Sequence, residues 1–101
     1  MTKSTCELDT TLNDLFDVIL DRKRTLPEDS YTAALFTHEK GENAVLEKLG
    51  EELTELILAV KDNDRDEIVH ESADIVYHLL VVLAMNDIDL ESLRSELETR
   101  R

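Results

Sequence analysis

The spacing of apolar residues between positions 43 and 85 limits the fold more than any other feature of this sequence. These residues recur every three or four positions, and one polar turn, DNDRD, interrupts them. The spacing matches the 3.6-residue period of an α-helix and predicts two helices, over 43–61 and from Asp64 or Asp66 to Met85. The first helix carries one apolar stripe, made of Val45, Leu49, Leu53, Leu56, Ile57 and Val60. Because helices joined by a short turn normally pack antiparallel, we expect a helical hairpin.

Three further helices are predicted outside this hairpin. Apolar residues in 11–24 also follow the helical spacing, and Thr11 is placed to cap the N-terminus of that helix. Ser30 is expected to cap a short helix that begins at Tyr31, and Asp89 a final helix near the C-terminus. With only two glycines and one proline in 101 residues, the chain suits helices with short connections.

The chain is therefore expected to form one all-α domain over 11–101, preceded by a flexible polar lead-in over 1–10. The predicted fold is an antiparallel bundle of about four to five helices. The run Leu79–Met85 is apolar nearly all round the helix, so one flank would stay wet in a small monomer. We expect a second copy to cover it, which predicts an obligate homodimer.

The chain is strongly acidic, with 24 Asp and Glu against 11 Lys and Arg and a net charge of −13. Such a charge repels nucleic acid, which is therefore not expected as a partner. The charge also suits a salt-loving host, or carboxylates that hold divalent cations. The single cysteine, Cys6, fits a reducing cytoplasm, and no apolar run approaches the ~20 residues of a membrane span. A cytoplasmic protein without a membrane partner is expected.

Two sets of polar residues border the apolar stripes of the hairpin. They are Lys48, Glu51, Glu52 and Glu55 on the first helix, and Glu67, Glu71, Asp74 and His78 on the second. Like charges one turn apart cost ~0.2–0.5 kcal/mol per pair, and more beside a core. A bound cation explains such clusters, and oxygen ligands select Mg²⁺ first, with Mn²⁺ as a substitute. Solvated helix faces are the alternative, because such pairs arise easily in so acidic a chain.

Two of these segments, EELTE at 51–55 and ESAD at 71–74, have the form E-E-x-x-E and E-x-x-D. This pair resembles the metal-binding signature of the MazG-like all-α nucleoside triphosphate pyrophosphohydrolases. More narrowly, the ordered segments DSYTAAL, KLGEELTEL, HESADIVYHLLVVL and LRSELETR are similar to the phosphoribosyl-ATP pyrophosphohydrolases. The similarity covers roughly Leu12 to Arg101. Leu53 and Thr54 depart from the family pattern, which usually has a small residue after the paired glutamates.

The resemblance implies hydrolysis of 1-(5-phosphoribosyl)-ATP to the AMP derivative and pyrophosphate, an early step of histidine biosynthesis. It also implies Mg²⁺ ligands at Glu52, Glu55, Glu71 and Asp74. We hypothesise that Glu51 or Glu52 takes the proton of the attacking water. A house-cleaning nucleoside triphosphate pyrophosphatase and a non-catalytic acidic helical adaptor remain as alternatives.

Several residues are candidates for contact with a nucleotide substrate: Lys48, Ser30, Tyr31, Thr32, Arg22 and His78. Lys48 is a candidate for a substrate phosphate, and the others supply hydroxyls, a base or a ring nitrogen. Four of them also have an ordinary structural explanation. Lys48 can form a local ion pair, Ser30 can cap a helix, Arg22 can complement a helix dipole, and His78 can form structural hydrogen bonds.

Overall fold

The computed structural model describes residues 2–101, with side chains from Glu7 onward, so the Cys6 thiol lies outside the described part. It contains five helices: α1 (Thr2–Thr25), α2 (Tyr31–Phe36), α3 (Glu42–Lys61), α4 (Arg65–Met85) and α5 (Leu90–Glu98). No strand occurs over residues 2–101. The predicted all-α fold of four to five helices is confirmed.

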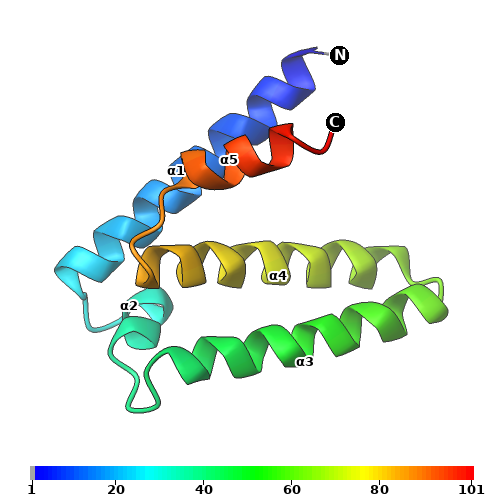
Figure 1. Ribbon diagram of the computed structural model, residues 1–101. Helices are drawn as coiled ribbons and strands as arrows, with labels where there is room; N and C mark the ends of the chain where they lie inside the picture. The colour runs from blue at the N-terminus through cyan, green and yellow to red at the C-terminus, as the bar shows by residue number, and fades with distance from the viewer. Residues whose placement is uncertain (1) are drawn as a thin grey trace.

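The predicted hairpin is the base of the molecule, with α3 and α4 running antiparallel side by side (Figure 1). α1 crosses the C-terminal end of α4, and α2 lies between the end of α1 and the start of α3. α5 turns back along α1, so both termini lie at the same end of the molecule. An ion pair joins these two helices, with Arg94 Nη1 at 3.2 Å from Asp9 Oδ2.

Three helix starts follow local side-chain chemistry as predicted. α3 does not, because its N-cap is Gly41 without a side-chain hydrogen bond, and Asn43, which we expected as the cap, lies inside the helix. Each confirmed cap accepts a hydrogen bond from a backbone N–H of the first turn, and the caps are Ser30, Asp64 and Asp89. Thr11 was predicted wrongly, because its hydroxyl donates to the Glu7 carbonyl at 2.9 Å inside α1. α1 begins at Thr2 and runs through the segment for which we expected a flexible lead-in. That segment has no glycine or proline to stop a helix, and a mid-helix threonine can bond the carbonyl four residues back.

The core lies where α1 crosses the hairpin. Its buried side chains are Phe16, Ile19, Leu35, Val45, Leu80, Val81 and Ala84. Most of the apolar run at the end of α4 is thus covered within one chain, and Leu79 is its exposed member at 38%. The expectation that this run as a whole needs a second copy for burial is wrong, since α1 packs against it.

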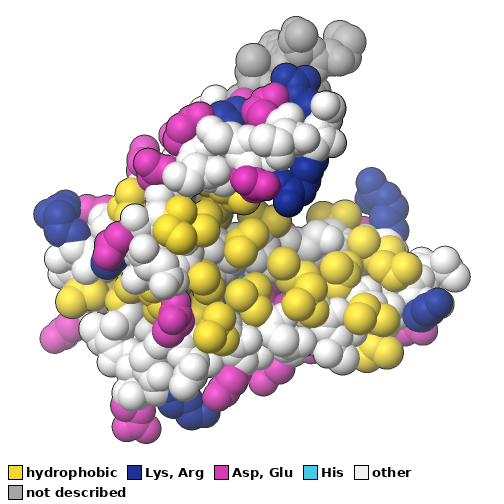
Figure 2. Space-filling view, in the orientation of Figure 1, with side chains coloured by type: hydrophobic (Ala, Val, Ile, Leu, Met, Phe, Trp, Pro, Cys, Tyr) yellow, Lys and Arg dark blue, Asp and Glu magenta, His cyan; other side chains and the backbone are white. Residues whose placement is uncertain are grey.

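The apolar stripe of α3 behaves in the opposite way. Val45 is fully buried, but Leu53, Ile57 and Val60 are 49%, 60% and 50% exposed. On α4, Val76 is 39% exposed. Figure 2 shows one face of the molecule, on which hydrophobic side chains form a band along the hairpin. Among the described residues, more exposed large apolar side chains therefore lie on α3 than on any other helix.

α4 is long and apolar enough to cross a membrane by length and composition. The core helix of a water-soluble protein passes the same test. α4 packs Leu80, Val81 and Ala84 into the core and carries Glu71 and His78 in buried positions. Its composition therefore does not indicate a membrane protein.

Candidate active site at the seam of α3 and α4

Two acidic side chains are buried along the seam between α3 and α4. Glu52 of α3 is 5% exposed and Glu71 of α4 is 6% exposed. Acidic residues are almost never buried to this degree unless a partner compensates for the lost hydration. The partners of these two carboxylates therefore define what the seam can do.

Glu52 has its partner within the protein. Its Oε1 lies 2.9 Å from Nδ1 of His78, a residue that is 4% exposed. The same Nδ1 lies 3.0 Å from the Asp74 carbonyl oxygen, and Nε2 lies 3.1 Å from the Tyr31 hydroxyl. A hydrogen-bonded chain thus runs from α2 through the His78 ring to the Glu52 carboxylate.

Glu71 has no such partner. Its Oε1 is buried and forms no hydrogen bond with any described residue. Burial raises the pKa of this carboxyl above its ordinary value of 4.5, and the nearby charge of Glu55 raises it further. An unpartnered buried carboxylate is costly, and a bound cation would compensate it. The oxygen donors at this point fit a hard divalent ion.

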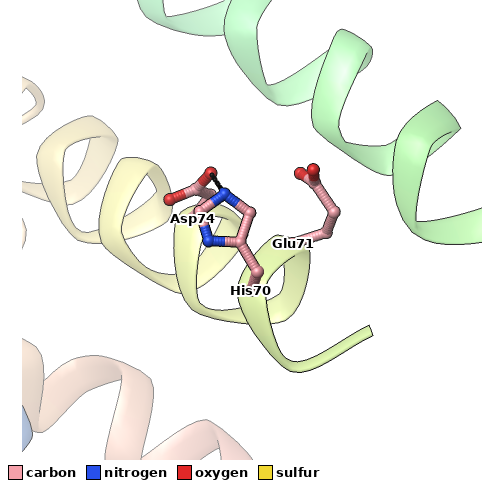
Figure 3. Close-up of side chains that lie close together, drawn as sticks. All are labelled: His70, Glu71 and Asp74. Carbon is pink, nitrogen blue, oxygen red and sulfur yellow. Dashed lines mark ion pairs between the residues drawn. The ribbon is translucent and has the colours of Figure 1, made fainter. Parts of the chain in front are cut away.

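One cluster of possible metal ligands lies around Glu71. Within the described part of the chain, His70, Glu71 and Asp74 place one ligand atom each within 4.8 Å of the others. His70 Nε2 lies 3.4 Å from Asp74 Oδ2, and Figure 3 shows Glu71 pointing from α4 toward α3. Sequence reasoning left His70 out of the ligand set. The four-residue spacing between His70 and Asp74 could have predicted their proximity, because it places both side chains on one face of the helix.

The predicted ligands on α3 take two different positions. Glu52 is hydrogen-bonded to His78, as described. Glu55 is exposed and lines a hollow with Glu71 at the turn end of the hairpin. This hollow is acidic, because its other charged lining residues are Asp62, Asp64 and Glu67. All four predicted ligands therefore border the seam, but only Glu71 and Asp74 belong to the tight cluster.

A second hollow lies beside the start of α3. It is lined by Tyr31, Lys48 and Glu51, which were predicted as site residues, and by His38 and Lys40, which were not. Lys48 Nζ lies 3.8 Å from Glu51 Oε1. His38 and Lys40 lie in the loop before α3, and Lys40 Nζ pairs with Glu47 Oε1 of the same hollow at 3.1 Å.

The remaining candidates have hydrogen-bond or ion-pair partners within the protein. Ser30 caps α2, and the Thr32 hydroxyl is hydrogen-bonded to the Tyr77 hydroxyl. Arg22 pairs with Asp21 of α1 at 2.7 Å. Ser30 thus has the capping role that was its ordinary structural explanation.

Comparison with known proteins identifies the family. Residues 12–101 match the family described as phosphoribosyl-ATP pyrophosphohydrolase. The chain belongs to this family. The matched range is the one over which its motifs resemble the family and includes every residue of the seam.

Relatives in this family are close in sequence. A protein of Haloarcula marismortui is 71% identical over 90 residues, which cover 89% of this chain and 92% of the relative. One of Halobacterium salinarum is 64% identical over 91 residues, covering 89% and 96%. One of Methanococcoides burtonii is 54% identical over 90 residues, covering 89% and 91%. All three are named phosphoribosyl-ATP pyrophosphatase, so the family is one of hydrolases rather than of non-catalytic adaptors.

Proposed function

We propose that this chain hydrolyses 1-(5-phosphoribosyl)-ATP to 1-(5-phosphoribosyl)-AMP and pyrophosphate in the cytoplasm, as a step of histidine biosynthesis. We further propose that the reaction depends on Mg²⁺, for which Mn²⁺ can substitute. The proposed Mg²⁺ requirement is supported by the buried Glu71 Oε1, which has no hydrogen-bond partner among the described residues. The proposed substrate is supported by family membership.

Four carboxylates would hold the ion: Glu52, Glu55, Glu71 and Asp74. When bound, Mg²⁺ supplies the positive charge that neutralises the phosphate oxygens and the leaving pyrophosphate. The need for this charge follows from the protein itself, which has a net charge of −13 and must hold a polyanionic substrate. Bridging cations allow an acidic protein to do so.

Glu51 is the better candidate for the group that takes the proton of the attacking water. Its side chain is exposed at the edge of the seam, beside Lys48. Glu52 is the alternative, but its Oε1 already accepts a hydrogen bond from His78. We therefore assign Glu52 to holding the ion and Glu51 to accepting the proton.

The hollow beside Glu51 supplies substrate contacts. Lys48 and Lys40 provide ammonium groups for phosphate oxygens, and the exposed ring of Tyr31 provides a surface for the substrate. Ser30 caps the short helix that carries Tyr31, and the hydrogen bond between Thr32 and Tyr77 joins this helix to α4. We assign Arg22 to the end of α1, where its charge complements the helix dipole.

A second copy of the chain is proposed to cover the exposed apolar stripe of α3. Ile57, 60% exposed, lies at its centre between Leu53 and Val60. Size-exclusion chromatography with light scattering should give a dimer for the wild type and a monomer for Ile57→Asp. Val18→Asp, at an exposed apolar position on α1, is the matched control and should remain dimeric. A wild type that is a stable monomer at micromolar concentration would contradict the dimer.

The activity is tested by pyrophosphate release in parallel assays with phosphoribosyl-ATP and ordinary nucleoside triphosphates. We expect kcat/KM to favour phosphoribosyl-ATP by about 100-fold or more, and chelation of divalent ions to abolish release. Comparable turnover of ordinary triphosphates would instead indicate a house-cleaning enzyme. Release that persists after chelation would contradict the Mg²⁺ requirement.

A further inference from the structure

His78 is a buried histidine whose ring bonds to two different parts of the proposed site. The residue is 4% exposed, which leaves little of it for direct contact with a substrate. Nδ1 faces Glu52 Oε1 at 2.9 Å, and Nε2 faces the Tyr31 hydroxyl at 3.1 Å. The ring also lies edge-on to Tyr77, with centroids 4.9 Å apart. The position of the ring is therefore fixed by contacts with α2 and α3 as well as within α4.

The hydrogen-bond partners assign the proton on this ring. Nδ1 lies within bonding distance of a carboxylate oxygen and of the Asp74 carbonyl at 3.0 Å, and both of these groups only accept. Nδ1 must therefore carry a proton. When the imidazole is neutral, Nε2 is then an acceptor for the O–H of Tyr31. Burial raises the pKa of Tyr31 above 10.0, which keeps that hydroxyl protonated and able to donate.

We propose that His78 is a positioning residue that fixes the rotation of the Glu52 carboxylate, holding Oε1 and leaving Oε2 directed to the divalent cation. The proposal rests on the metal-dependent function proposed above. It assigns to His78 the part that outer hydrogen-bond partners take in metal sites, where they orient a ligand without touching the ion. Tyr31 extends the same chain to the hollow that contains Lys48, so the ion-binding carboxylate and the substrate-facing ring are held by one side chain.

A histidine that only fills space in the core would give a different result on substitution. Asparagine places its amide nitrogen near the position of Nδ1, so His78→Asn keeps a donor for Glu52 and loses the acceptor for Tyr31. Glutamine reaches toward the position of Nε2, so His78→Gln keeps a partner for Tyr31 and loses the donor for Glu52. Both changes remove the ring and its packing against Tyr77. A packing role predicts similar losses, whereas a positioning role separates the two variants.

The test measures Mn²⁺ affinity by titration calorimetry on the full chain, with thermal melts in chelator to compare the folded states. We expect His78→Gln to bind Mn²⁺ about 10- to 100-fold more weakly than wild type. His78→Asn keeps the donor for Glu52 and loses only the contact with Tyr31, so we expect a smaller loss of affinity. Equal affinities in wild type and both variants, or equal losses in both, would overturn the positioning role alone. A wild type that binds no Mn²⁺ would overturn the proposed metal dependence, and the inference with it.

Tyr31→Phe keeps the test decisive if both His78 variants fail to fold. This change removes the O–H that holds Nε2 and leaves the aromatic ring in place. We expect it to weaken Mn²⁺ binding by a smaller factor than His78→Gln. Unchanged affinity in folded Tyr31→Phe protein would overturn the role of the hydrogen-bonded chain.

Discussion

The two buried glutamates of the hairpin, Glu52 and Glu71, differ in one respect. Their exposures are nearly equal, at 5% and 6%. Glu52 is hydrogen-bonded to His78, whereas Glu71 keeps a buried oxygen without a partner among the described residues. The Glu52 carboxylate is thus compensated when the protein folds, whereas the buried Glu71 oxygen has no hydrogen bond to compensate it. The difference supports the proposed cation site, in which Glu71 would hold the ion and His78 would orient Glu52.

The largest expected effect is on turnover. Glu71→Gln and Glu52→Gln each remove a negative charge from the proposed ion site and should lower kcat for phosphoribosyl-ATP by more than about 100-fold. Glu67→Gln is the matched control, because Glu67 lies one helical turn before Glu71 and lines the same hollow. It should keep most of the activity. Equal losses in all three variants would show that overall charge, rather than two particular ligands, determines turnover.

The second effect is on stability without ions, where the two glutamates should respond in opposite directions. Glu52→Ala removes the acceptor of His78 Nδ1 and should destabilise the protein by about 1–3 kcal/mol. Glu71→Gln removes a buried charge that has no partner and should raise the melting temperature. Thermal denaturation in chelator measures both. A lower melting temperature for Glu71→Gln would indicate that the ionised carboxylate is already compensated.

The third effect is the pH dependence of the rise in melting temperature expected for Glu71→Gln. Because burial raises the pKa of Glu71 above 4.5, the folded state binds its proton more tightly than the unfolded chain does. The stabilisation from the protonated Glu71 carboxyl is complete at a pH below 4.5 and is lost as the pH rises through the pKa of the folded state. The difference in melting temperature between Glu71→Gln and wild type should therefore widen with increasing pH. A difference that stays constant with pH would contradict the raised pKa.

The smallest effect concerns an exposed carboxylate that has a partner. Asp87 accepts a hydrogen bond from Lys23 at 2.8 Å, and this bond holds its pKa below 3.8. The stabilisation from the ionised Asp87 is present at a pH above 3.8 and is lost as the pH falls through the pKa of the folded state. This pH dependence is opposite in sign to that of Glu71. Asp87→Asn should lower the melting temperature slightly at neutral pH and leave Mn²⁺ affinity unchanged. Weaker Mn²⁺ binding in this variant would show that general electrostatics, not the seam, sets the affinity.

Features that depend on local chemistry could be predicted from the sequence. Ser30, Asp64 and Asp89 cap their helices because a side-chain oxygen meets backbone N–H groups only a few residues away. The helical period also placed the acidic sets beside the seam. Thr11 shows the limit, since a hydroxyl can cap a helix or bond within it and the choice depends on what precedes it.

Features that depend on packing could not be predicted. The period puts Glu52, Glu55 and Glu71 on similar faces, but it does not say which one is buried or which finds a partner. The contact between Glu52 and His78 joins two helices across 26 positions of sequence and requires their relative rotation. Burial of Leu80 by α1 and exposure of Ile57 likewise depend on where α1 crosses the hairpin.

The most direct test of the cation site is a crystal structure with Mn²⁺ and phosphoribosyl-AMP, in which anomalous scattering locates the Mn²⁺ ion. We expect a Mn²⁺ peak in the seam at about 2.0–2.2 Å from Glu71 Oε1, with Glu52 still hydrogen-bonded to His78. Peaks confined to exposed carboxylates, with Glu71 Oε1 still lacking any partner, would contradict the account.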